Sequence, residues 1–139
     1  GNTWLTNLFI ISGVMIFILA ANLAVYKKLL QLKTAIYLLF ITFLIQIVIS
    51  PNWFNHFDTT IKIPLAVLAL NTPHFFSGYI FTTLFNQSKQ KSLAFGSNLL
   101  GSAVGGFFQA ASFLFGLSSL LYLTIFFYGL GILNIIRKK

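Results

Sequence analysis

Polar residues that could do chemistry interrupt one long apolar stretch of the sequence, in the order Asn71, Thr72, Pro73 and His74. Proline has no backbone N–H, so in a helix Pro73 would leave the carbonyl of Ala69 without its usual partner. A proline kink in a continuous helix is the commoner result. The alternative is a broken helix, in which Thr72 caps a half-helix that begins at Pro73. Transporter binding sites are often built from such breaks.

His74 is the residue of this stretch that can change its charge, and an ionisable side chain in an apolar segment is a functional candidate by default. It could relay protons or serve as an axial ligand of a haem or chlorin. A neutral imidazole can also hydrogen-bond to a neighbour, and we expect that packing role. His56 and Asp58 share one loop without the third ligand of a metal site, so we expect them to be solvated. The sequence predicts no resident cofactor and no catalytic constellation.

A second set of unusual residues lies in the apolar stretch 92–115, where small residues recur, namely Gly96, Gly101, Gly105, Gly106 and Ala110. Gly101 and Gly105 form a GxxxG pair, a spacing that flattens one helix face and lets a neighbouring backbone approach closely. Asn98, Ser102 and Gln109 fall near the same face at 100° per residue. Helix packing with interhelical hydrogen bonds is the ordinary interpretation. The alternative is a solute or ion path lined by Asn98 and Gln109.

The elements that must position these residues follow from the composition. Of the 139 residues, 58% are hydrophobic and only 7% are charged, against about 25% charged in soluble domains. This small number of charged residues cannot cover a solvated surface. Most of the surface must therefore face lipid or other apolar protein. A net charge of +8 would indicate nucleic-acid binding in a soluble protein. Here the basic residues lie in short clusters between apolar runs, so we expect no nucleic acid.

Five apolar stretches are long enough to cross a bilayer, at about residues 4–26, 34–50, 63–85, 92–115 and 117–136. About 20 apolar residues span the roughly 30 Å hydrocarbon layer, and runs of this length can satisfy their backbone only as helices. The sequence therefore predicts an all-α fold: one transmembrane domain over residues 1–139, a polytopic helical bundle of about five transmembrane helices. Pro51 should end the second helix, and the short turn at Gly116 should join the last two in an antiparallel hairpin.

The basic residues predict the orientation of these helices. Eight follow the first, third and fifth stretches, namely Lys27, Lys28, Lys33, Lys89, Lys91, Arg137, Lys138 and Lys139. Only Lys62 falls on the opposite side. Cytoplasmic loops carry the excess of lysine and arginine, so we expect the N-terminus outside and the C-terminus in the cytoplasm. We assign this multi-pass protein to a bacterial inner membrane.

A combination of motifs between about Ile63 and Ile136 resembles a known family. Its features are Pro73 followed by Phe75, Phe76 and Gly78, then the pattern Asn98-Leu99-x-Gly101-x-x-x-Gly105-Gly106, then the turn at Gly116. Together they resemble the membrane domain of the spermidine synthase-like transmembrane proteins. The resemblance implies the C-terminal part of a larger membrane domain that lacks the aminopropyltransferase-like domain and its activity. Relatives usually carry an acidic and an aromatic residue where this chain has Gln109 and Ala110.

Three functions are compatible with these residues. We expect a non-catalytic integral membrane subunit, embedded in the lipid bilayer, whose glycine-rich helix packs against other transmembrane subunits in a homo- or hetero-oligomer. The alternative is half of a transporter for a small solute such as a polyamine, with a site at a broken third span. A second alternative is a cofactor-binding membrane protein that uses His74.

Overall fold

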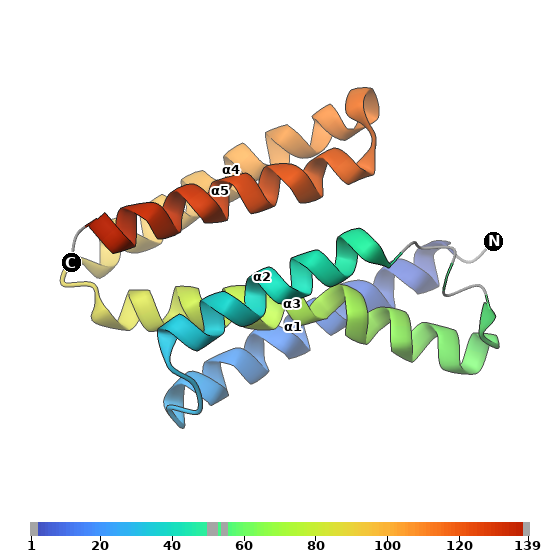
Figure 1. Ribbon diagram of the computed structural model, residues 1–139, viewed down its shortest axis with the longest axis horizontal. Coiled ribbons are helices and arrows are strands. Elements are labelled where there is room, and N and C mark those ends of the chain that lie inside the picture. Colours follow the sequence, from blue (N-terminus) through green and yellow to red (C-terminus); the bar gives the residue numbers. More distant parts are fainter. Residues whose placement is uncertain (1–2, 50–52, 54–55, 138–139) are drawn as a thin grey trace. The chain divides into compact units, whose positions relative to one another are not determined.

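Five helices make up the computed structural model, which describes residues 3–49, 53 and 56–137 (Figure 1). They are α1 (Thr3–Tyr26), α2 (Leu32–Val48), α3 (Thr59–Gln87), α4 (Lys91–Phe115) and α5 (Leu117–Arg137). The described residues include no β-strand. The predicted all-α class and the five helices are confirmed. Ser50 and Pro51, where the second helix was expected to end, lie outside the described residues, as do Lys138 and Lys139.

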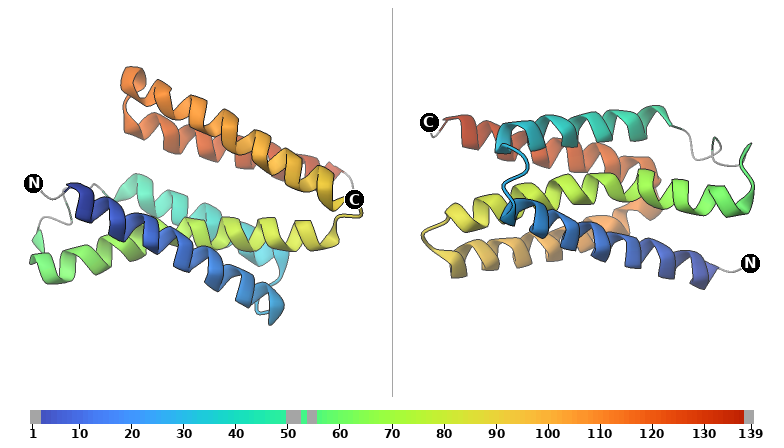
Figure 2. Two further views of the ribbon diagram at one scale, coloured as in Figure 1. Left: turned by 180° about the vertical axis from the view of Figure 1, so that it is seen from behind. Right: turned by 90° about the horizontal axis from the view of Figure 1, so that it is seen from below.

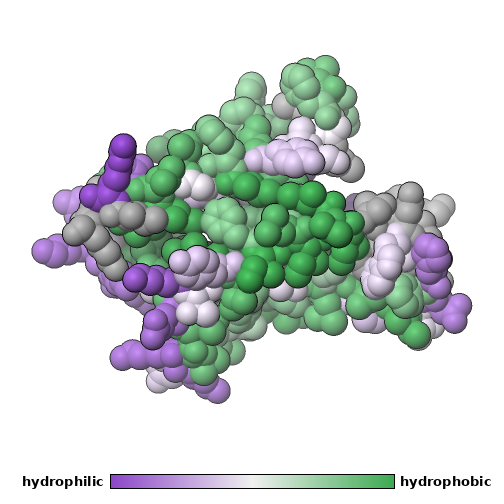
Figure 3. Space-filling model, in the orientation of Figure 1, coloured by the Kyte–Doolittle hydropathy of each residue, from purple (hydrophilic) through white to green (hydrophobic). Residues whose placement is uncertain are grey.

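Three helical stretches among the described residues are long and apolar enough to cross a membrane: Asn7–Tyr26, Lys91–Phe115 and Ser118–Ile135. At 17 residues α2 is apolar but shorter than a usual span. The 29 residues of α3 include two prolines and the polar residues near its middle. Hydrophobic side chains cover much of the face shown in Figure 3, and some are almost fully exposed, such as Phe113 at 93%.

The chain divides into two compact units, Gly1–Gln87 with α1, α2 and α3, and Ser88–Lys139 with α4 and α5. In the first unit α3 contacts both α1 and α2 and runs between them in the right-hand view of Figure 2. Small residues bring α1 close to α3: Ala21 and Ala24 are buried, and a Cβ built on Gly78 would lie 3.3 Å from that of Ala21. On the other side α2 buries Leu39 and Phe43.

The second unit is a helical hairpin that reverses at one residue, Gly116 (Figure 1). Gly116 has a φ of 80°, which side chains with a Cβ rarely adopt, and its N–H donates to the carbonyl of Ser112 at 2.8 Å. The rings of Phe108 and Phe127 meet between α4 and α5, with centroids 5.9 Å apart. The predicted antiparallel hairpin is confirmed.

Candidate functional site

Pro73 lies inside α3, which continues through it without a break. The hydroxyl of Thr72 does not cap a new helix but donates back to the carbonyl of Leu68 at 2.5 Å. The alternative of a half-helix beginning at Pro73 is therefore wrong, and the continuous helix is confirmed. A serine or threonine hydroxyl that donates to the preceding turn is ordinary within a helix.

Gln46 of α2 supplies the donor that Pro73 lacks. Its side-chain amide donates to the carbonyl of Ala69 at 3.2 Å, with a second, longer contact of 3.4 Å to the carbonyl of Leu70. Ala69 precedes Pro73 by four residues, so it is the carbonyl that the proline leaves without a backbone partner. Sequence reasoning missed Gln46. Its signal is an isolated amide in an otherwise apolar helix, which must find a partner on a neighbour.

Asn71 is buried in the contact between α3 and α1, with 1% of its surface exposed. Its amide nitrogen donates to the carbonyl of Val67 at 2.8 Å. Its oxygen has no hydrogen-bond partner among the described residues. On α1 the facing residue is Gly13, where an added Cβ would lie only 2.7 Å from the Asn71 nitrogen. Gly13, also missed by sequence reasoning, thus leaves the space that the Asn71 side chain occupies.

His74 follows one turn later on α3 and is exposed. Among the described residues its imidazole makes no hydrogen bond, and its backbone carbonyl accepts one from the Ser77 hydroxyl at 3.2 Å. No cluster of three or more His, Cys, Asp and Glu residues that could hold a metal occurs in the described ranges. In the loop before α3, His56 and Asp58 are exposed, as predicted, and the His56 ring donates to the carbonyl of Trp53 at 3.1 Å.

The glycine-rich face of α4, defined here by the GxxxG pair Gly101 and Gly105, which lie about 40° apart around the helix, is open. Gly96 and Gly106 lie at least about 100° away from this pair around the helix. Within the second unit, a Cβ added at Gly96, Gly101, Gly105 or Gly106 would meet no described atom within 4 Å. Ala110, Asn98, Ser102 and Gln109 are also exposed. The Ser102 hydroxyl donates within the helix to the carbonyl of Asn98 at 3.0 Å. The side-chain amides of Asn98 and Gln109 donate to no other described residue, so they remain available to a neighbour.

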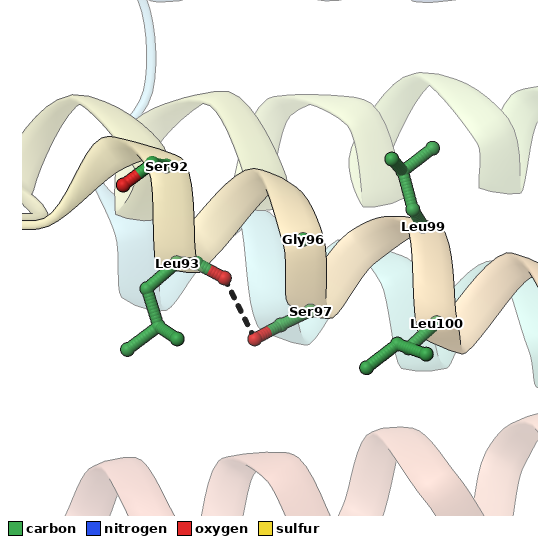
Figure 4. Close-up of a pocket in the computed structure, with 6 residues that line it drawn as sticks. All are labelled: Ser92, Leu93, Gly96, Ser97, Leu99 and Leu100. Atoms are coloured by element: carbon green, nitrogen blue, oxygen red, sulfur yellow. Dashed lines mark hydrogen bonds between the residues drawn. The ribbon is translucent and has the colours of Figure 1, made fainter.

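A hollow of about 490 Å³ lies on α4 over Gly96, and Figure 4 shows the six residues that line it, Ser92, Leu93, Gly96, Ser97, Leu99 and Leu100. All six belong to one helix, so the hollow is open rather than enclosed. Leu93 and Leu100 project to one side of α4 and Leu99 to the other. The Ser97 hydroxyl donates to the carbonyl of Leu93 at 2.9 Å. A mostly apolar hollow in which the Ser97 hydroxyl is already bonded suits a neighbour's side chain better than a polar solute.

The candidate residues therefore form two groups with different surroundings. Asn71, Pro73 and His74 belong to the first unit, where the first two are buried. Those of α4 belong to the second unit and are open. Comparison with protein-family models, curated proteins and solved structures finds no match to this chain. The resemblance to the spermidine synthase-like transmembrane proteins stays a prediction.

Proposed function

We propose that this chain is a non-catalytic subunit of an integral membrane complex and that it docks onto other transmembrane helices through the glycine-rich face of α4. The observation that carries this proposal is the open space beside Gly101 and Gly105, which share one face of the helix. Their helix is one of the three stretches apolar enough to cross a membrane. Between membrane helices, close backbone approach and interhelical hydrogen bonds take the place of the hydrophobic effect. Asn98 and Gln109 offer the hydrogen bonds.

The proposed setting is a bacterial inner membrane, with all five helices crossing in alternation, the N-terminus outside and the C-terminus in the cytoplasm. Because α2 has 17 residues, it covers about 25 Å at 1.5 Å per residue and needs slight local thinning of the bilayer. The 29 residues of α3 cover about 43 Å and would tilt or extend beyond the hydrocarbon. Both adjustments cost only fractions of a kcal/mol per Å. The proposed relationship to the spermidine synthase-like membrane domain fits the same setting.

The surroundings of the first unit's polar residues favour packing over transport. The carbonyl freed by Pro73 is bound by Gln46, and the Asn71 side chain fills the space beside Gly13. A transport or cofactor role would therefore depend on His74, which has no ionisable neighbour among the described residues of its helix turn.

The test is a matched pair of substitutions on α4. Gly105→Leu places a large side chain on the open face, whereas Ala103→Leu places the same side chain on an exposed position about 160° away around the helix. Both variants would be extracted from membranes in mild detergent and compared with the wild-type chain by native gel electrophoresis. We expect Gly105→Leu to convert the larger species to the free subunit and Ala103→Leu to migrate as the wild type does. Unchanged migration of Gly105→Leu would contradict the proposal, as would equal dissociation of both variants.

A further inference from the structure

The segment between α1 and α2 carries a concentration of exposed positive charge. Lys27, Lys28 and Lys33 are all exposed within seven consecutive residues. Beside them Tyr26 and Leu29 expose 85% and 63% of their surfaces. Exposed tyrosine next to lysine is typical of the boundary between hydrocarbon and headgroups. The segment thus combines cationic groups with side chains suited to that boundary.

Lys28 holds a backbone conformation that favours glycine. Its φ is 52°, in the left-handed region where a Cβ crowds the backbone. Its N–H donates to the carbonyl of Val25 at 3.0 Å, and that of Leu29 donates to the carbonyl of Ala24 at 3.1 Å. This pair of bonds is the Schellman ending of a helix, which usually has glycine at the position of Lys28. Lys28 thus carries its charge at a position where glycine would be the less strained residue.

Tyr79 fixes the same segment to α3. Its hydroxyl donates to the carbonyl of Leu30 at 2.5 Å and accepts from the Leu30 N–H at 3.1 Å. The Tyr79 side chain is itself buried, with 2% exposed. Two bonds to one loop residue from a buried side chain set the position of the backbone that carries the lysines. Their ammonium groups are therefore attached to a defined backbone.

No acidic side chain of this chain lies near these lysines. Its single acidic residue, Asp58, directly precedes α3, and Tyr79 lies about 20 residues farther along that continuous helix. At 1.5 Å per residue the distance between Asp58 and Tyr79 along the helix is roughly 30 Å. This distance is at least about three Debye lengths at physiological salt. Asp58 therefore leaves Lys27, Lys28 and Lys33 without a neutralising acidic side chain among the described residues.

We propose that residues 27–33 form a binding site for the phosphate of anionic phospholipids in the adjoining leaflet. Ammonium groups recognise the phosphate, and Tyr26 and Leu29 lie against the glycerol and acyl region. Under the proposed orientation this leaflet is cytoplasmic, where juxtamembrane lysines attract anionic lipids. The site rests on the proposed membrane location and is independent of docking by α4.

The test measures lipid preference directly. The full chain would be reconstituted in phosphatidylcholine bilayers containing a small amount of spin-labelled phosphatidylglycerol or spin-labelled phosphatidylcholine. The fraction of each label that the protein immobilises is read by electron paramagnetic resonance. We expect the wild type to prefer phosphatidylglycerol and Lys28→Gly to lower that preference by up to about fivefold at low salt, while its thermal stability stays equal or rises. Lys28→Arg should keep the preference.

Two further variants separate a built site from net charge. Lys62→Gln removes one charge at the other end of α3 and should change the preference less than twofold. Tyr79→Phe removes no charge but releases Leu30, so it should lower the preference while helix content is kept. Equal effects of Lys28→Gly and Lys62→Gln, or a wild type without preference, would overturn the proposal. Release of the lipid by millimolar inorganic phosphate at constant ionic strength would show a free-phosphate site and overturn the lipid assignment. Because α4 docking is read on a native gel, either proposal can fail alone.

Discussion

Gly13→Ala should destabilise the first unit, although alanine is the better helix former. The added Cβ would lie 2.7 Å from the Asn71 nitrogen and 3.0 Å from a Val67 methyl. Because Asn71 is buried, its side chain must move and lose its bond to the Val67 carbonyl. Overpacking costs about 1–3 kcal/mol and the lost bond about 1 kcal/mol. Helix propensity returns about 1 kcal/mol, which leaves a net loss of about 2 kcal/mol.

Unfolding in mixed micelles, followed by circular dichroism against the mole fraction of denaturing detergent, measures this change. The matched control is Gly129→Ala in α5, where an added Cβ meets nothing within 4 Å among the described residues. At Gly129 only the higher helix propensity of alanine acts. The Gly129→Ala variant should therefore be stabilised by up to about 1 kcal/mol. A double-mutant cycle with Asn71→Ala isolates the steric cost of the added Cβ. In the Asn71→Ala background, Gly13→Ala should destabilise the protein by at least about 1 kcal/mol less than it does in the wild type. Strict additivity, or equal effects at Gly13 and Gly129, would refute the reasoning.

Three other predictions follow from the same contacts and orientation. Gln46→Leu should lower the free energy of unfolding by about 1–2 kcal/mol, because a carbonyl of α3 loses its donor. Pro73→Ala should remove most of that loss in a double-mutant cycle, since alanine restores the backbone N–H. Thr82→Val breaks a 2.6 Å hydrogen bond to α1 and should cost about 0.6 kcal/mol, the average for such bonds in membranes; a loss above 2 kcal/mol would be inconsistent with that role. Because the sequence lacks cysteine, a membrane-impermeant maleimide should label His56→Cys in intact cells and Ser88→Cys only after lysis. Labelling of both in intact cells would contradict the orientation.

The five helices were predictable because their signal is local. Apolar runs of this length have one way to satisfy their backbone in lipid, and the turn at Gly116 needs a residue without a Cβ. The consequence of Pro73 was also predictable to a point, since a missing N–H always leaves the carbonyl of Ala69 without its backbone partner. The replacement donor was not, because it lies on another helix. Helical periodicity tells which residues share a face, but not which face meets which neighbour.

Because periodicity does not show which neighbour a helix face meets, the sequence could not tell which candidate residues are buried. Asn71 and Asn98 look alike in the sequence, as amides within apolar runs, yet one is buried against α1 and the other is exposed on α4. The difference depends on Gly13, whose missing side chain admits Asn71. No comparable neighbour appears beside Asn98 among the described residues. Sequence spacing alone marks both as candidate polar residues within apolar helices.

The exposed amides of α4 and the glycines beside them together explain why a neighbour is expected there. An amide moved into hydrocarbon without a partner costs roughly 2–7 kcal/mol, so Asn98 and Gln109 would destabilise a spanning α4 that faced only lipid. The partner cannot be α5 in its present position, because α5 meets α4 at Phe108, and Gln109 lies about 100° farther around the helix. The missing side chain of Gly105 lets another backbone come close enough to accept from these amides. On a membrane-spanning α4, as proposed, the polar groups would favour a neighbouring helix, and Gly101 and Gly105 would let that helix approach closely.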